Sequence, residues 1–126
     1  MVADEPPGGT TVDLIDPTAA PSGPGCADCE AAEPRGWWFH LRRCAACGHV
    51  GCCDSSPAQH ARAHVAASGH TVVRSYEPGE EWFYDFGSDE TYASGPDLAP
   101  PLNHPDDQPA PGPRGRVPWN WTTKLH

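Results

Sequence analysis

One stretch of 27 residues, CAACGHVGCCDSSPAQHARAHVAASGH, holds four of the chain's six cysteines and four of its seven histidines. It runs from Cys44 to His70. Thiolate sulfur and imidazole nitrogen are donors that zinc prefers in proteins, but clustered cysteines also form disulfides, redox pairs and nucleophiles. The spacing of these residues must decide among the four kinds of site.

Two C-x-x-C pairs, Cys26 with Cys29 and Cys44 with Cys47, are separated by 14 residues. A two-residue gap lets both thiolates reach one ion from a tight turn, and the separation is close to that of four-cysteine zinc sites. Four further candidate ligands follow: Cys52, His60, His64 and His70. Eight donors fit two closed tetrahedral zinc sites. Either the two pairs share one ion, or each pair joins later ligands in a cross-brace, and the spacing alone allows both.

The segment SSPAQHARAHVAASG predicts a helix over residues 57–68. Ser55 or Ser56 could cap it, Pro57 suits its first turn and Gly69 ends it. Residues four apart lie on the same face of a helix, so His60 and His64 share a face without having to bind the same ion.

Three short segments predict strands: WWFHLRRC (37–44), HTVVRSY (70–76) and EWFYDF (81–86). The first alternates and should place Trp38, His40 and Arg42 on one face, whereas the second is rich in β-branched residues. We therefore expect a small α+β, zinc-stabilised domain in which a short antiparallel sheet packs on one main helix.

The domain is expected to occupy residues 25–87. Residues 1–24 and 88–126 are rich in proline and have little apolar surface, so we expect both tails to be largely disordered. A core built from about 60 residues gives only marginal stability without a cross-link, and a bound metal ion is a common cross-link in small domains.

The formal net charge is −9, and residues 26–86 carry five arginines against eight acidic residues. This balance argues against nucleic acid and against anionic membrane surfaces as partners. The sequence shows neither a signal peptide nor a transmembrane run, which predicts a cytoplasmic protein whose thiols stay reduced. The composition is typical of a GC-rich bacterial genome, and we expect a monomer.

The order of the motifs resembles the ubiquitin-specific-protease-type (UBP-type) zinc finger, in its bacterial branch. The resemblance extends from Cys26 to Asp85: C-x2-C, Trp, C-x2-C, C, H-x3-H, SGH, an apolar run and an aromatic pair. It implies a cross-brace of two zinc ions. The implied ligands of the first are Cys26, Cys29, Cys52 and His60. Those of the second are Cys44, Cys47, His64 and His70. We favour Cys52 as the ligand, with Cys53 as the alternative.

The resemblance also implies a pocket for the free C-terminal end of a protein, lined by Trp38, Trp82 and Tyr84. An equally plausible interpretation assigns most of the aromatic residues to the core. Where the resemblance implies a carboxylate-binding arginine, this chain has Asp54, whose charge opposes a carboxylate and argues against ubiquitin as the ligand. Arg42, Arg62 or Arg74 could compensate if the fold brings one of them there.

We therefore expect a non-catalytic zinc finger that binds a protein or peptide C-terminus as an adaptor module. No catalytic motif accompanies the ligands, and two closed zinc sites leave no open position for water. The alternative is a zinc or redox sensor, or a zinc-storage protein, with labile cysteines. His49 is expected to be a hydrogen-bonded, partly buried ring, and Trp119 with Trp121 could form a docking motif in the tail.

Overall fold

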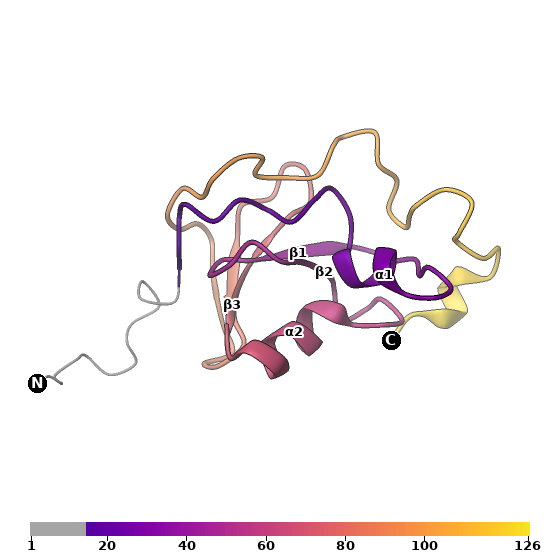
Figure 1. The fold of residues 1–126 in the computed structure, drawn as a ribbon, viewed down its shortest axis with the longest axis horizontal. Helices are drawn as coiled ribbons and strands as arrows, with labels where there is room; N and C mark the ends of the chain where they lie inside the picture. The colour runs from indigo at the N-terminus through magenta and orange to yellow at the C-terminus, as the bar shows by residue number, and fades with distance from the viewer. Residues whose placement is uncertain (1–14) are drawn as a thin grey trace, which may run out of the picture.

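The computed structural model of the chain describes residues 15–126. Its centre is one antiparallel sheet with the strand order β2-β1-β3-β4-β5 (Figure 1). The strands are β1 (Leu41–Cys44), β2 (Val50–Cys52), β3 (Val72–Ser75), β4 (Phe83–Asp85) and β5 (Glu90–Tyr92). The helices are α1 (Ala27–Ala31), α2 (His60–Ser68) and the 3-10 helix η2 (Trp121–Lys124). The expected small α+β domain with an antiparallel sheet and one main helix is confirmed.

The element boundaries differ from the predicted ones in instructive ways. The first strand begins at Leu41, because Trp38 instead forms an isolated bridge with Gly112 of the C-terminal segment. The main helix begins at His60, because Gln59 before it has a left-handed backbone (φ 52°) and its side chain makes no capping hydrogen bond. Gly69 ends the helix as predicted, with φ 79°. Strands β2 and β5 and helix α1 were not predicted.

Alternation along β1 directs its two arginines to opposite faces of the sheet. Arg42 lies on the face where Ala61 of α2 packs. Arg43 is fully buried on the other face and lies directly opposite Arg74 of β3 in the register. Two buried cations side by side are unfavourable unless other groups satisfy them. Burial lowers the pKa of Arg43, and Arg74 adds to this effect.

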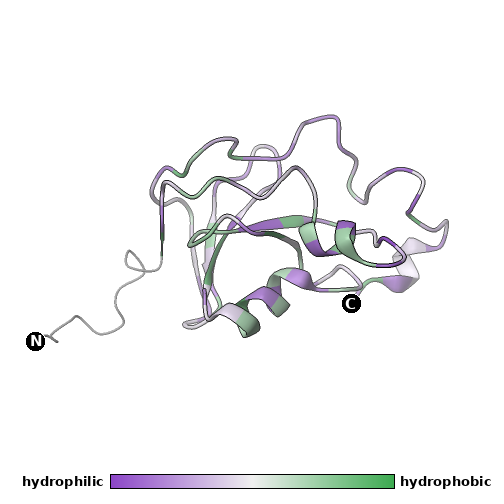
Figure 2. Cartoon of the chain, in the orientation of Figure 1, coloured by the Kyte–Doolittle hydropathy of each residue, from purple (hydrophilic) through white to green (hydrophobic). Residues whose placement is uncertain are grey.

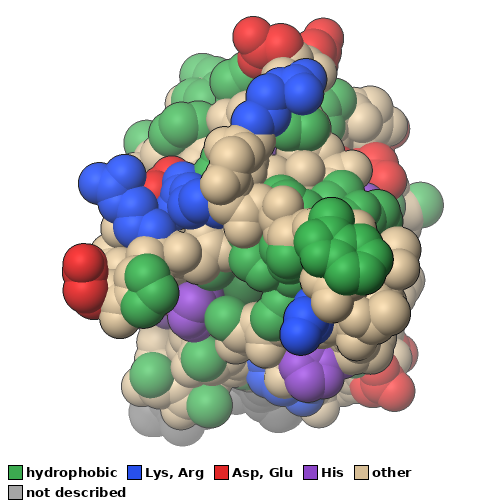
Figure 3. Space-filling view, turned by 90° about the vertical axis from the view of Figure 1, so that its right-hand side faces the viewer, with side chains coloured by type: hydrophobic (Ala, Val, Ile, Leu, Met, Phe, Trp, Pro, Cys, Tyr) green, Lys and Arg blue, Asp and Glu red, His purple; other side chains and the backbone are tan. Residues whose placement is uncertain are grey.

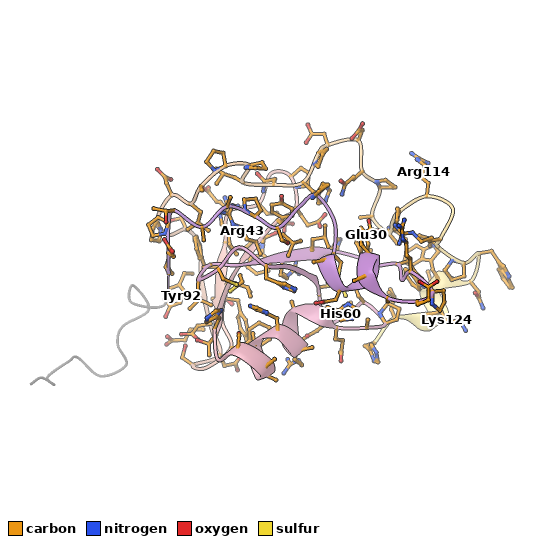
Figure 4. The ribbon with its side chains drawn as sticks, viewed as in Figure 1. Glu30, Arg43, His60, Tyr92, Arg114 and Lys124 are labelled. Carbon is orange, nitrogen blue, oxygen red and sulfur yellow. The ribbon has the colours of Figure 1, made fainter. Side chains whose placement is uncertain are left out.

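Backbone carbonyls of the two flanking segments accept hydrogen bonds from these arginines, although Nε of Arg43 is buried without a partner among the described residues. Arg43 donates to the carbonyls of Ala19 (2.8 Å) and Pro101 (3.0 Å), and Arg74 donates to that of Leu102 (2.7 Å). In Figure 1 the N-terminal segment and the C-terminal segment run along the same side of the sheet, with α2 on the opposite side. Figure 4 labels Arg43 beneath them.

The expected disorder of the tails therefore differs from the structure over residues 15–24 and 88–126, while residues 1–14 lie outside the described part. These segments are polar and proline-rich, but buried side chains bind their carbonyls. A further contact joins the C-terminal segment to the domain. His104 Nε2 lies 3.0 Å from Glu77 Oε1, and both side chains are largely buried. The second Glu77 oxygen accepts the backbone N–H of Leu41.

Two small clusters form the core. The first combines the thiols of Cys26, Cys29 and Cys52 with four larger apolar side chains, namely Trp38, Leu41, Val50 and Tyr76. The second contains Ala45, Val72, Phe83 and Leu98. Figure 2 shows that α2 carries both hydrophilic and hydrophobic residues along its length. Much of the buried volume is thus sulfur and aromatic carbon, as expected where metal replaces a large core.

The C-terminal end returns to the domain. Trp121 of η2 packs on Phe39 with ring centroids 5.7 Å apart, whereas Trp119 is 92% exposed. Figure 3 views the end of the molecule that lies on the right in Figure 1, and hydrophobic side chains gather there. The docking role of these tryptophans stays a prediction. Within the described residues, no helix is long and apolar enough to cross a membrane.

Candidate zinc sites and an aromatic cavity

The first cluster of donors consists of Cys26, Cys29, Cys52 and His60. One ligand atom from each residue lies within 4.8 Å of all the others. His60 Nδ1 is 3.3 Å from the sulfurs of Cys26 and Cys29 and 3.7 Å from that of Cys52. The three thiols are at most 1% exposed.

Three separate elements position this cluster. Cys26 is the N-cap of α1, and its sulfur accepts the N–H of Cys29, so the short helix forms around the first C-x-x-C pair. Cys52 ends β2, and His60 opens α2 (Figure 4). The strand and the helix come close at Gly51, where a Cβ would lie 2.7 Å from the backbone nitrogen of Ala61. Glycine at this position therefore lets His60 approach Cys52.

The second cluster consists of Cys44, Cys47, His64 and His70, again with one donor atom from each within 4.8 Å of the others. Cys44 Sγ is 3.7 Å from His70 Nδ1, and Cys47 Sγ is 3.4 Å from His64 Nε2. Cys44 ends β1, His64 lies one turn after His60 on α2, and His70 follows Gly69. Unlike the thiols of the first cluster, Cys47 is exposed.

Both donor sets fit zinc. With Zn–S near 2.3 Å and Zn–N near 2.0–2.1 Å, a tetrahedral ion separates two sulfurs by about 3.8 Å and a sulfur from a nitrogen by about 3.6 Å. The Cys29 and Cys52 sulfurs are 4.0 Å apart, and the sulfur–nitrogen distances above lie close to the expected edge. The hydrogen bonds of Cys26 and Cys52, together with burial, raise the pKa of Cys29. Three thiolates at one point thus need a cation, which zinc would supply.

The partition left open by spacing is the cross-braced one in the structure, because each C-x-x-C pair meets its own later donors. Cys52, not Cys53, joins the first cluster. Cys53 instead lies 3.5 Å from the Ser56 hydroxyl. Burial raises the pKa of Cys53, but hydrogen bonds with His40 and Ser56 outweigh it and lower the pKa to about 7.

His49 lies between the two clusters without belonging to either. Its Nε2 is 3.0 Å from an Asp28 carboxylate oxygen within the first C-x-x-C loop. Its ring stacks on that of His64, with centroids 4.3 Å apart and planes 6° from parallel. Its Nδ1 is buried without a hydrogen-bond partner. Sequence reasoning predicted the partly buried ring but not this link between the sites.

A cavity of about 490 Å³ opens on the sheet face that carries α2. Strands β1, β3, β4 and β5, the residues flanking β4, the loop after β2 and helix α2 all contribute to its lining. The lining residues are Arg42, Cys53, Asp54, Ala61, Val73, Trp82, Tyr84, Phe86 and Thr91. The expected pocket residues Trp82 and Tyr84 meet here, and Phe86 packs edge-on against Tyr84. Arg42, one of the three arginines considered, lies over the Trp82 ring with its guanidinium carbon 4.7 Å from the centroid.

Trp38 does not line this cavity. It is 4% exposed within the first core cluster and is covered by the bridge to Gly112 and by the guanidinium of Arg116, 5.7 Å from its ring. Trp38 thus follows the core interpretation, because the ordered C-terminal segment covers it. Sequence reasoning missed Phe86 and Thr91, although the period-two alternation from Trp82 already pointed to Phe86.

The family model for the Zn-finger in ubiquitin-hydrolases and other proteins matches residues 26–96. The chain belongs to this zinc-finger family. The fold is also similar to the solution NMR structure of protein RPA1320 from Rhodopseudomonas palustris. The two sequences are 38% identical, the match covers 80% of this chain and 91% of that one, and the TM-score is 0.59. None of the curated proteins matches the chain.

The family match confirms the resemblance drawn from the motifs. It begins at Cys26, the first ligand, and extends past β5, which the expected boundary at residue 87 left out. Together with the two Cys/His clusters, it supports zinc binding at two sites.

Proposed function

We propose that this zinc finger is a non-catalytic module that binds the free C-terminal end of a protein or peptide in the aromatic cavity. The position of the Arg42 guanidinium at the cavity is the observation that carries the proposal. Arg42 lies over Trp82, and no ion pair within residues 15–126 involves it. Among the same residues, the one hydrogen bond of its side chain is to the carbonyl of Leu41.

An unpaired guanidinium beside aromatic walls suits a carboxylate. Arginine presents several N–H donors in a plane that matches the two carboxylate oxygens. Trp82, Tyr84, Phe86 and Val73 provide apolar surface for the last side chains of a peptide. Pockets of this size commonly combine apolar walls with a few polar groups that fix the orientation of the ligand.

The donor sets support the part of the proposal that assigns binding without catalysis. Each cluster offers four protein ligands, and a tetrahedral zinc with four protein ligands has no position left for a reacting water. The zinc ions would then hold together α1, β2 and α2, and the cavity would do the binding.

The test compares two peptides of identical sequence that end in a free carboxylate or in an amide, titrated into the zinc-loaded protein. We expect amide-shift changes at Trp82, Tyr84 and Phe86 with the carboxylate form only. Arg42→Gln should lose the preference, and Arg35→Gln, an exposed arginine outside the cavity, should keep it. Equal binding of the two peptides to the wild-type protein would contradict the proposal.

A second candidate function is favoured by the exposed thiol of Cys47 in the second cluster. A zinc site with an exposed cysteine can exchange its metal or become oxidised, as a zinc or redox sensor requires. Metal stoichiometry by native mass spectrometry before and after mild oxidation tests this role. Loss of one zinc from an otherwise folded chain supports it, whereas retention of both argues for the binding module alone.

A further inference from the structure

The C-terminal segment 112–126 is fixed to the domain at both of its ends. Gly112 forms the backbone bridge with Trp38, and the N–H of His126 donates to the carbonyl of Ser55 at 3.1 Å. The residues between these two contacts are therefore presented on an ordered scaffold. An ordered surface loses less conformational entropy on binding a partner than a flexible tail does.

Trp119 projects from this scaffold into solvent. It is 92% exposed, whereas Trp121, two residues later, packs on Phe39. The backbone that carries the exposed ring is held by a hydrogen bond, in which the N–H of Trp121 donates to the carbonyl of Pro118 at 3.1 Å. A tryptophan buries about 150–250 Å² when it is covered, and tryptophan and arginine are enriched among the residues that dominate binding energy at protein interfaces. The exposed ring is therefore a suitable anchor for a partner.

The exposed arginine and lysine side chains that lack an ion pair lie at the same end of the molecule. Within the described part of the chain they are Arg35, Arg114 and Lys124. Figure 4 labels Arg114 and Lys124 at this end. The hydrogen bond from Arg116 to the carbonyl of Gly36 places the loop that carries Arg35 beside the C-terminal segment.

This end of the molecule differs in charge from the rest of the chain. The remaining exposed arginine, Arg62 of α2, is paired with Asp54 at 2.6 Å. No acidic residue follows Asp107 in the sequence, although the formal net charge of the chain is −9. In Figure 3, which views this end, basic side chains lie among the hydrophobic ones and acidic side chains lie at the margin. We define the C-terminal patch by four residues: Trp119, Arg35, Arg114 and Lys124.

We propose that the C-terminal patch is a docking surface for an acidic segment of a partner protein. Apolar side chains of that segment cover the Trp119 ring, and its carboxylates lie opposite the three unpaired cations. Complementary charge of this kind speeds association and selects among partners. The patch lies outside the aromatic cavity, so this interaction is independent of the proposed function.

The charge of the whole chain favours a short acidic segment over an extended polyanion. Nucleic acids and anionic bilayers carry negative charge over distances longer than the patch. The carboxylates elsewhere in the chain, five of them in residues 80–90 alone, would repel such partners. At physiological salt, charges interact over about 8 Å. A segment that contacts only the patch therefore experiences mainly its three cations.

The test uses the zinc-loaded full chain and three twelve-residue peptides in which leucine and phenylalanine alternate with Glu, Gln or Lys. Both peptide ends are blocked, by acetylation and amidation, so that no free carboxylate can enter the aromatic cavity. The indole N–H resonance of Trp119 reports contact, and fluorescence anisotropy at two salt concentrations gives the dissociation constants. We expect the Glu peptide to shift this resonance and to bind about tenfold more tightly than the Gln peptide, with a smaller ratio at high salt. The Lys peptide should not bind.

Three variants assign the binding to residues. Trp119→Ala should weaken the Glu peptide by about tenfold or more, because the apolar anchor is lost. Arg114→Gln should weaken it by about twofold to fivefold and reduce the salt dependence. Arg62→Gln removes the same charge outside the patch, is the matched control and should leave the affinity unchanged. All three side chains are exposed, and metal content and amide spectra establish that each variant is folded.

Each other outcome contradicts the proposal at a defined point. Equal affinities for the Glu and Gln peptides overturn the acidic partner, and unchanged affinity in Trp119→Ala overturns the docking surface. A single-stranded oligonucleotide or a phosphatidylglycerol vesicle that binds the patch more tightly than the Glu peptide assigns it to a polyanion instead. Sedimentation of the chain alone tests a second copy: a dimer that is lost in Trp119→Ala would make the patch a self-association surface. Because the peptides have blocked ends, none of these results bears on the cavity.

Discussion

The two Cys/His clusters share helix α2 but differ in their surroundings. The first has three thiols that are at most 1% exposed, and these thiols pack within a core cluster under Trp38. The second has two thiols and two imidazoles, of which Cys47 is exposed and both rings are partly exposed. The same kinds of donor thus lie in two environments: the first cluster is part of the buried core, and the second lies at the edge of the domain, partly exposed to solvent.

The largest expected effect is on folding. Cys52→Ser should unfold the domain, because structural zinc contributes about 10–16 kcal/mol of binding free energy in zinc-finger peptides, as much as a domain's whole stability. Cys47→Ser is the matched variant at the second cluster and should leave the sheet folded with one zinc. Circular dichroism, amide-proton dispersion and metal content measure both. Equal unfolding by the two substitutions would break the comparison.

The next effect is kinetic. A chelator should remove the second zinc at least about tenfold faster than the first, because local opening at an exposed site costs less free energy than opening the core. Native mass spectrometry over the time course should show a one-zinc species that accumulates. Thiol alkylation of that species should modify Cys47 and Cys44 first. Simultaneous loss of both ions would show that the clusters open as one unit.

A smaller effect concerns the link between the clusters. His49→Ala removes both the contact with the Asp28 carboxylate and the ring stacked on His64. Groups that orient a metal ligand affect metal affinity, so we expect the second site to weaken by about threefold to tenfold while the first is unchanged. Competition with a chelating dye measures this. Asp28→Asn, which keeps a hydrogen-bond acceptor, should have a weaker effect of the same sign.

The smallest effect is expected on the free energy of unfolding when Arg116, which packs over Trp38 beside the first cluster, is replaced. Arg116 lies over Trp38, donates to the carbonyl of Gly36 and forms an ion pair with Glu30. Arg116→Ala should lower the free energy of unfolding by about 1 kcal/mol, as expected for a partly exposed cation–π contact. Chemical denaturation checks it. Arg114→Ala, an exposed arginine on the same segment, is the control and should change nothing.

Much of the metal centre was predictable because ligand types and spacing are local. The C-x-x-C pairs, the helical offset of His60 and His64 and the stop at Gly69 can all be read along the chain. The partition between two ions was not, because it depends on which strand lies beside which helix. Spacing allowed both arrangements, and only the family resemblance pointed to the cross-brace.

The cavity was predicted in part. Trp82 and Tyr84, which the family resemblance implied, both line the cavity, and their role in binding a peptide stays a prediction. Trp38 does not line it, because its burial depends on Gly112 and Arg116, more than 70 positions later in the chain. The pairing of Asp54 with Arg62 was also missed, because a turn and the left-handed Gln59 separate them.

The tails were misjudged for a related reason. A proline-rich segment with few apolar residues has little hydrophobic surface to bury, and that argument predicts disorder. That argument leaves out the hydrogen bonds that side chains of the sheet donate to backbone carbonyls of these segments. Arg43 and Arg74 look like ordinary solvent-facing strand residues, yet both are buried and bind carbonyls of the flanking segments.

The guanidinium of Arg43 has a consequence for the chain as a whole. It binds one carbonyl from each flanking segment, Ala19 before the domain and Pro101 after it, and thereby closes a large loop without a covalent bond. Each segment shields the charge for the other, so their contributions to stability are coupled. Deleting either one alone should cost more than its own contacts. Replacing Arg43 by methionine should loosen both segments near Ala19 and Pro101 while their other contacts persist, and faster amide hydrogen exchange in both segments would show it.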